Sequence, residues 1–196
     1  MQAAGVKAAE ADLSDVDLSG ADLRNAEFLR MGLSGVDFRK ADLRGADMFW
    51  SDTEGASFDG AKLRGASLFE VYLVDSDLRE QDLTGISLHN SLVGRVDLRR
   101  AKLGKAMLVA AVFTDVDLRS ADLRGAQLNS AEFSRSQLQG AHLDDADLTN
   151  ADLRTARGLT VEQVLTAQLS PDTRFPPDVA RDGRVQKRMQ TGRPLT

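Results

Sequence analysis

The chain has 196 residues, and its 30 acidic and 25 basic side chains give a formal net charge of −5. This length fits one domain, and the lack of cysteine excludes disulfides and thiolate metal ligands. Residues 1–10 lack the basic and then apolar pattern of a signal peptide, and no apolar run is long enough to span a membrane. We therefore expect a cytoplasmic protein with no membrane contact.

After a lead-in of residues 1–10, every fifth residue from Leu13 to Leu153 is apolar or nearly so. Of these 29 central residues, 26 are Leu or Phe, and the others are Met48, Thr53 and Val93. The frame continues without a slip through residues 11–156. An internal repeat of this kind determines the architecture of a chain before any local pattern is considered.

A period of five matches neither regular element. A five-residue step rotates a helical side chain by about 140°, and an odd period places alternate side chains of a strand on opposite faces. A coil that turns a corner every five residues brings each central side chain to a common axis. The repeat therefore predicts a solenoid in which the central residues form the core.

The residues around each central position support such corners. The second residue after it is often Gly or Asn, which tolerate the positive φ of a type II turn. At Lys40, Glu80 and Arg100 we expect turns without a positive φ. The second residue before the central one is usually Ala, a small neighbour for a large side chain. Met31, Gln81 and Ile86 depart from that rule and should mark local irregularities.

Units such as Ala21-Asp22-Leu23-Arg24-Asn25 resemble those of the pentapeptide-repeat family, across roughly residues 11–156. The resemblance implies an all-β solenoid, a right-handed quadrilateral parallel β-helix with four units per coil. Twenty residues per coil then gives about seven coils, and a rod of about 35 Å at the usual strand spacing.

The repeat ends before residue 157, and residues 157–177 should cap the last coil. Thr160 and Gln163 form a capping-box pattern before a helix from Val161 to about Leu169, whose apolar side includes Val164 and Leu165. By resemblance, such a C-terminal helix also makes a homodimer possible. Residues 178–196 are polar and basic, and we expect a flexible tail there.

Catalytic ingredients are sparse. His89 and His142 lie 53 residues apart, and neither has a partner at ligand or catalytic spacing. Aspartates that precede the central residues often have Arg two positions later, as in Asp77 and Arg79, which favours exposed ion pairs over a metal or acid–base site. We expect no enzyme activity, no metal and no cofactor.

The repeat also assigns each residue to one of four sides. Side one is centred on Leu13 and every twentieth residue after it, and sides two, three and four start at Leu18, Leu23 and Phe28. Side one has 8 acidic and 3 basic residues and side four has 4 and 1, whereas sides two and three are nearly neutral. The candidate acidic side is represented by Asp52, Glu54, Asp75, Asp115 and Glu132.

Apolar residues occupy outward positions at the corner between sides four and one. We call this set the apolar edge. It consists of Leu29, Phe49, Trp50, Phe69, Tyr72, Val74, Leu92, Val109 and Val112. A contiguous exposed apolar patch is typical of an interaction surface, and aromatic residues are frequent interface anchors. The edge could bind a foreign protein, form a homodimer face or be covered by Phe175-Pro176-Pro177.

These features favour a non-catalytic protein–protein interaction module. A first alternative comes from the resemblance, because some pentapeptide-repeat proteins mimic DNA and bind type II topoisomerases such as gyrase, protecting against quinolones. The charge of residues 11–156, −8, is several-fold weaker than that of DNA over the same length. A second alternative is a purely structural or self-associating rod. Direct nucleic-acid binding is not expected, since only the tail is basic.

Overall fold

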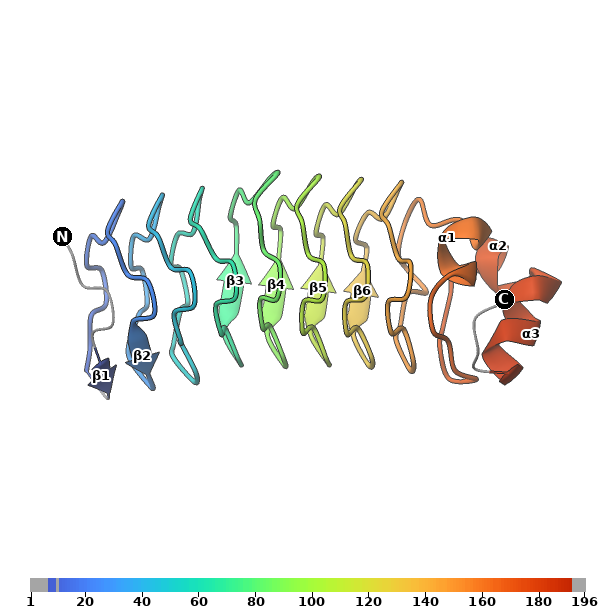
Figure 1. Ribbon diagram of the computed structural model, residues 1–196, viewed down its shortest axis with the longest axis horizontal. Helices are drawn as coiled ribbons and strands as arrows, with labels where there is room; N and C mark the ends of the chain where they lie inside the picture. Colours follow the sequence, from blue (N-terminus) through green and yellow to red (C-terminus); the bar gives the residue numbers. More distant parts are fainter. Residues whose placement is uncertain (1–6, 10, 192–196) are drawn as a thin grey trace.

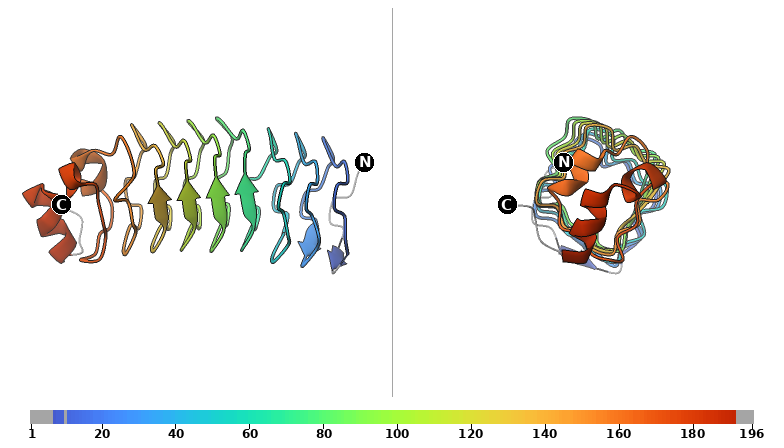
Figure 2. Two further views of the ribbon diagram at one scale, coloured as in Figure 1. Left: turned by 180° about the vertical axis from the view of Figure 1, so that it is seen from behind. Right: turned by 90° about the vertical axis from the view of Figure 1, so that its right-hand side faces the viewer.

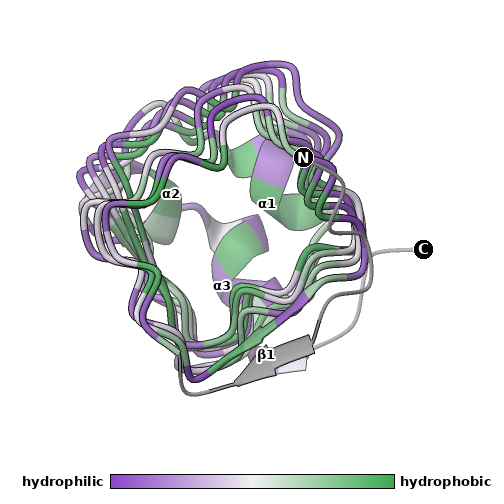
Figure 3. Ribbon diagram, turned by 90° about the vertical axis from the view of Figure 1, so that its left-hand side faces the viewer, coloured by the Kyte–Doolittle hydropathy of each residue, from purple (hydrophilic) through white to green (hydrophobic). Residues whose placement is uncertain are grey.

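A computed structural model of the chain describes residues 7–9 and 11–191. The repeat forms a rod of stacked coils, with the N-terminus at one end and three short helices at the other (Figures 1 and 2). Viewed along the rod, successive coils trace the same four-sided outline (Figure 3). The chain is thus a right-handed quadrilateral parallel β-helix, which confirms the predicted fold class.

Neighbouring coils pair in parallel, and through residue 157 the paired residues are 20 positions apart. On side one, strands β3 (Tyr72–Val74), β4 (Leu92–Gly94), β5 (Val112–Thr114) and β6 (Glu132–Ser134) form one sheet in that order. Strand β1 (Lys7–Ala9) pairs with β2 (Glu27–Leu29) in the same register. Part of the expected lead-in therefore already belongs to the ladder; the remainder of residues 1–10 lies outside the described residues.

The central side chains and the small residues two positions before them fill the interior. Leu33, Leu63 and Leu128, for example, have no exposed surface. Phenylalanines in adjacent coils stack, with 4.9 Å between the ring centroids of Phe113 and Phe133. Burial of each such side chain contributes about 1.5–3 kcal/mol before the entropy of ordering the chain is subtracted. The core is a continuous column that needs no cross-links.

The corner turns are more uniform than the sequence predicts. Lys40, Glu80 and Arg100 have φ values of 59°, 60° and 60°, so the expected turns without a positive φ are wrong. Their amides explain the difference, because each donates to a carbonyl of the next coil, Lys40 to Asp59 at 2.9 Å. The ladder holds these residues in the left-handed region despite the local cost of that conformation.

Buried serines replace the direct hydrogen bond across several corners. The Ser91 hydroxyl donates to the carbonyl oxygen of Leu68 at 2.6 Å and accepts from the amide of Val71 at 3.2 Å. Ser51 bridges Phe28 and Met31 in the same way, which makes the corner at Met31 irregular as predicted. The small residue beside the central one can therefore also satisfy the backbone of the preceding coil.

Before the capped end, the described ladder is interrupted between the coil of residues 51–70 and the coil of residues 71–90. In the other coils before residue 140, the amide of a central residue donates to the carbonyl 19 positions later, as Leu33 does to Asp52 at 2.7 Å. The amides of Thr53 and Leu63 have no such bond in the described part of the chain, whereas Leu68 regains it with Ser87 at 2.8 Å. We call this interruption, on sides one to three, the seam.

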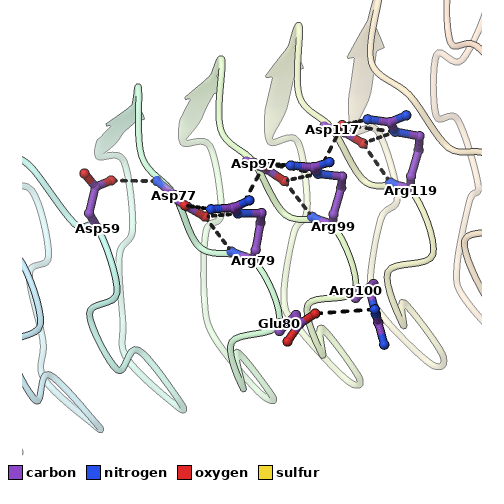
Figure 4. A network of polar contacts seen from close by, with 9 residues as sticks. All are labelled: Asp59, Asp77, Arg79, Glu80, Asp97, Arg99, Arg100, Asp117 and Arg119. Atoms are coloured by element: carbon purple, nitrogen blue, oxygen red, sulfur yellow. Dashed lines mark hydrogen bonds and ion pairs between the residues drawn. The ribbon is translucent and has the colours of Figure 1, made fainter.

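At the seam, side chains replace several of the backbone hydrogen bonds, although the amides of Gly60 and Gly65 still donate to Asp77 and Thr84, each at 3.1 Å. The Asp59 carboxylate accepts from the amide of Asp77 at 2.6 Å, which is visible beside the Asp77–Arg79 pair in Figure 4. The Thr53 hydroxyl contacts the backbone of Tyr72 on side one. Gln81, one of the predicted irregular positions, lies on side three of the seam and is half-buried. Ile86 is buried and keeps the regular turn bond to Leu83, so no irregularity occurs there.

The first helix, α1 (Val161–Leu165), closes the last coil. Thr160 and Gln163 form the predicted capping box. The Gln163 amide nitrogen also donates to the carbonyls of Leu138 and Ala141, at 2.9 and 2.8 Å. The helix ends at Leu165 rather than near Leu169, because the chain then rejoins the ladder, where Gln168 pairs with Asp147. Leu169 is buried within that extended segment.

The expected polar tail is structured through residue 191. Helices α2 (Pro177–Ala180) and α3 (Gly183–Thr191) pack at the capped end of the rod (Figure 1). Val179 and Val185 are buried there, as is Arg188, which donates to the carbonyl of Ala167. The prediction of a flexible segment is therefore wrong for residues 178–191. Although the segment is rich in charged residues, α3 also has an apolar stripe, Val185 and Met189, that packs against the core. Residues 192–196 lie outside the described part.

Candidate protein-interaction surface

The apolar edge lies outside the core along one corner of the rod. Trp50, Tyr72 and Leu92 are 52%, 48% and 40% exposed, and with Val16 they are the only exposed large apolar residues of the described chain. The other six members of the edge, Leu29, Phe49, Phe69, Val74, Val109 and Val112, are half-buried. The repeat thus placed all nine outward. Tyr72 and Leu92 pair on consecutive coils, and Trp50 ends the coil of residues 31–50.

Three aromatic members of the edge, Phe49, Trp50 and Phe69, stack on one another. Ring centroids are 5.5 Å apart between Phe49 and Trp50 and 5.0 Å apart between Phe49 and Phe69. The ladder continues to His89, whose ring lies 6.0 Å from that of Phe69. Stacked rings are rigid and bring a large apolar area at low entropic cost, which suits an interface anchor.

No segment of the described chain covers the edge. Phe175 and Pro176 are buried at the capped end, where Arg174 pairs with Asp152 of the last coil. The edge starts near the opposite end, before β3 (Figure 1). Coverage of the edge by Phe175-Pro176-Pro177 is therefore excluded, because that segment continues the ladder instead of running back along the rod.

Ion pairs divide the candidate acidic side into two groups. Asp75 pairs with Arg95 at 2.5 Å and Asp115 with Arg135 at 2.6 Å, each along side one from coil to coil. Hydrogen bonds from these arginines hold the pKa of both carboxyls below its usual range. Asp52, Glu54 and Glu132 form no ion pair within the described residues. The unneutralised charge is concentrated next to the aromatic residues, at Asp52 and Glu54.

Sides two and three carry the predicted ladders of Asp–Arg pairs. Asp97 and Asp117 accept from Arg99 and Arg119, each at 2.6 Å, and Arg99 also lies 3.6 Å from Asp117 in the next coil (Figure 4). Each aspartate also accepts from the amide of its own arginine, as Asp97 does at 3.1 Å. These carboxylates are part of the turn and are neutralised, so they are scaffold rather than a reactive site.

In the described part of the chain, the two histidines lie apart and neither belongs to a catalytic group of residues. The His89 ring nitrogen contacts the hydroxyl of Ser87 at 3.0 Å, and His142 lies beside Asp122 on another side. Among the described residues, no three His, Cys, Asp or Glu side chains could together hold a metal ion. None of the helices described here is long and apolar enough to cross a membrane.

One charged member of the corner was not predicted from the sequence. The guanidinium of Arg30 lies over the Trp50 ring, 5.3 Å from its centroid. Arg30 occurs 20 residues before Trp50, so the register of the coils would have placed the two side by side. With Ser51, Asp52, Glu70 and Tyr72 they line an open, shallow pocket of about 500 Å³. We call this pocket the notch.

Comparison with known proteins identifies the repeat. The family model described as pentapeptide repeats matches eight copies over residues 11–48, 97–135 and 131–157. The crystal structure of HetL, a pentapeptide repeat protein involved in heterocyst differentiation regulation from Nostoc sp. strain PCC 7120, is similar to the chain. The two share 26% identity with a TM-score of 0.56, over 79% of this chain and 83% of HetL.

Two further solved structures match less closely. A pentapeptide repeat protein of the Arabidopsis thaliana thylakoid lumen shares 30% identity over 64% of this chain and 70% of its own, with a TM-score of 0.37. Full-length QnrB1, a plasmid-mediated fluoroquinolone resistance protein, shares 20% over 84% and 93%, with a TM-score of 0.34. No curated protein sequence matches significantly. The repeat units, the coil geometry and the family match together show that the chain belongs to the pentapeptide-repeat family.

Proposed function

We propose that the chain is a non-catalytic protein-interaction module that presents the apolar edge to a protein partner. The stacked ladder of half-buried Phe49 and Phe69 with exposed Trp50 is the observation that carries this proposal. Exposure of apolar rings to water is unfavourable, and stacking within the monomer covers only part of their surface. A partner that removes the remaining surface from water would account for the ladder.

The shape of the surface favours a protein over a small ligand. The pocket at the edge is open and shallow, whereas small-molecule sites bury most of their ligand in a concave cavity. A rigid β-helix also holds Trp50, Tyr72 and Leu92 in fixed positions, so that little entropy is lost when a partner docks. The edge accordingly suits a flat or extended protein surface.

A capture experiment tests the proposal. The double variant Phe49→Ser/Phe69→Ser should lose proteins that the wild-type rod retains from a lysate of the source organism. Both rings are half-buried on the outside of the coil, so the column of central residues should stay intact. Val16→Ser, which changes an exposed valine on side two, is the matched control. Equal capture by the wild type and the double variant would remove the edge from the proposal.

Self-association is the main competitor and has a separate readout. If a second copy covers the edge, light scattering after size-exclusion chromatography should give the mass of a dimer for the wild type and of a monomer for Phe49→Ser/Phe69→Ser. A monomeric wild type, or a dimer that survives this change, leaves the edge free for a different protein.

A DNA mimic that binds a type II topoisomerase is the second candidate. It is favoured by the carboxylates of Asp52, Glu54 and Glu132, which form no ion pair in the described chain. The paired aspartates of sides two and three count against it, because their charge is neutralised every coil. Supercoiling by purified gyrase, with and without the protein and ciprofloxacin, tests this function. Neither inhibition nor protection is expected.

A further inference from the structure

The notch exists because the seam opens on side one. Elsewhere on this side neighbouring coils pair directly, as Gly32 does with Asp52 and Tyr72 with Leu92. Asp52 and Tyr72 lack this pairing. Instead the Thr53 hydroxyl donates to the Tyr72 carbonyl at 2.9 Å and accepts from its amide at 3.0 Å. A side chain thus occupies the space of a direct backbone bond, and the surface between Trp50 and Tyr72 is opened.

Thr53 forms the bridge on side one and is unusual in its position. It is the only polar residue among the 29 central residues, and it is fully buried. A leucine there would fill the core but could not form this side-chain bridge. On side one the seam therefore coincides with a departure from the repeat, and it lies beside the most exposed aromatic side chains of the described chain.

The lining of the notch combines aromatic rings with carboxylates. Trp50 and Tyr72 are both about half exposed, and Asp52 and Glu70, from the coil of residues 51–70, line the notch with them. Asp52 accepts hydrogen bonds from Ser34 and Glu54, and Glu70 accepts one from Asn90 at 3.3 Å. None of these donors is cationic. The notch thus has two negative charges and one positive charge, that of Arg30.

The position of Arg30 shows which chemistry the notch accommodates. Its guanidinium lies over the face of Trp50, the geometry in which an aromatic ring attracts a cation. Arg30 forms no ion pair within the described residues, unlike Arg95 and Arg135 farther along the rod. A partner that covers the notch would remove the rings of Trp50 and Tyr72 and the two carboxylates from water. The single positive charge of Arg30 balances only one of the two negative charges, so a second cation would be favourable.

We propose that the notch binds a basic side chain, an arginine or lysine, of the protein partner. This inference rests on the proposed function, since it names the residue type that a partner would insert beside the apolar edge. The rings would contact the apolar stem and the charged head, while Asp52 and Glu70 would accept its hydrogen bonds. The other aspartates of the candidate acidic side, Asp75 and Asp115, already form ion pairs with Arg95 and Arg135.

A short peptide tests the notch without a known partner. Trp50 is the only tryptophan, so its indole N–H gives a single cross-peak in a proton–nitrogen correlation spectrum of the full chain. We expect the peptide acetyl-Gly-Arg-Gly-amide to shift this peak saturably. The citrulline analogue, which has the same shape without the charge, should bind at least about fivefold more weakly, since a cation over an exposed ring and nearby carboxylates both contribute.

Three variants locate the effect. Asp52→Asn/Glu70→Gln should lower the affinity for the arginine peptide by about fivefold or more, because it removes the negative charge of both acceptors. Asp144→Asn/Asp145→Asn makes the same change in net charge on side three and should leave the affinity unchanged. Arg30→Ala should strengthen binding, since it removes a like charge from the notch. Circular dichroism and the melting temperature would verify that each variant is folded.

Several outcomes would overturn this inference. They are no saturable shift, equal binding of the arginine and citrulline peptides, and equal weakening by the two carboxylate variants. The proposed function would be judged separately by capture with Phe49→Ser/Phe69→Ser. If that variant loses the partner while Asp52→Asn/Glu70→Gln retains it, the edge binds proteins through apolar contacts and the cation site is wrong. If neither change affects capture, both proposals fail.

Discussion

The side-chain hydroxyl of Thr53 is bonded to both polar groups of the Tyr72 backbone, donating to the carbonyl at 2.9 Å and accepting from the amide at 3.0 Å. This contact joins two coils that do not pair directly on side one. It links a departure from the repeat in the core to an opening on the surface. On side one, Thr53 therefore lies at both the seam and the notch.

Thr53→Val should destabilise the rod by about 1–3 kcal/mol, because the Tyr72 amide and carbonyl would lose a buried partner. Valine keeps the shape of the side chain, so the loss reports on the hydroxyl. Urea unfolding followed by circular dichroism measures the free energy of unfolding. Thr149→Val, at a threonine whose hydroxyl has no hydrogen bond in the described chain, is the control. An unchanged midpoint for Thr53→Val would show that the bridge is not needed.

Ser91→Ala should also cost about 1–3 kcal/mol, since it leaves the carbonyl of Leu68 and the amide of Val71 without a partner inside the rod. Ser134→Ala removes a half-buried hydroxyl that makes no bond of its own and should have little effect. The two variants can be compared in the same urea series. Similar losses for both would contradict the bridging role of the buried serines.

Gln163→Ala should loosen the cap. The side chain completes the capping box of α1 and donates to the carbonyls of Leu138 and Ala141. Loss of a helix cap costs about 0.5–2 kcal/mol, and two released carbonyls add to it. Hydrogen exchange should increase first in residues 138–166 and much less around Leu43. The exposed Gln168, changed to Ala, is the control; exchange that rises evenly along the rod would argue against a local cap.

The Asp–Arg ladders predict a loss of stability in acid. Hydrogen bonding from Arg24 holds the pKa of Asp22 at about 2, and the arginine partners of Asp37, Asp42 and Asp152 lower the pKa of those carboxyls in the same way. A pKa that is lower in the folded chain than in the unfolded chain stabilises the fold above the unfolded value. This contribution is complete above about pH 4 and is lost as the pH falls toward about 2. Melting temperatures measured from pH 7 to pH 2 should stay level and then fall below about pH 4. A melting temperature that rises across the acid range would contradict it.

The sequence was sufficient for the fold because the repeat is regular. The central residues, the small neighbours and the outward edge all follow from one period, and the Thr160–Gln163 cap has a local signature. The positive φ at Lys40 was not predictable from residue type, since the hydrogen bond to Asp59 in the next coil imposes it. The order of α3 depends on packing of Val185 against the capped end, which charge counting could not show.

The seam and the notch illustrate a different limit. Thr53 is conspicuous in the sequence as the polar member of the central series, yet its effect depends on how its hydroxyl meets Tyr72 one coil later. The stacking of Arg30 on Trp50 could have been inferred from their 20-residue separation once the register was known. The pocket that Arg30 and Trp50 line with Asp52, Glu70 and Tyr72 depends on side-chain positions, which the repeat alone does not determine.

The central claim, that the apolar edge contacts a protein partner, is tested most directly by crosslinking at defined positions. The photoreactive residue p-benzoylphenylalanine would replace Tyr72 in one variant and His142, an exposed residue on side three, in another. After irradiation in cells of the source organism, the Tyr72 variant should give a discrete crosslinked product with a different protein, and the His142 variant should not. Crosslinks of equal yield at both positions, or none at position 72, would contradict the account.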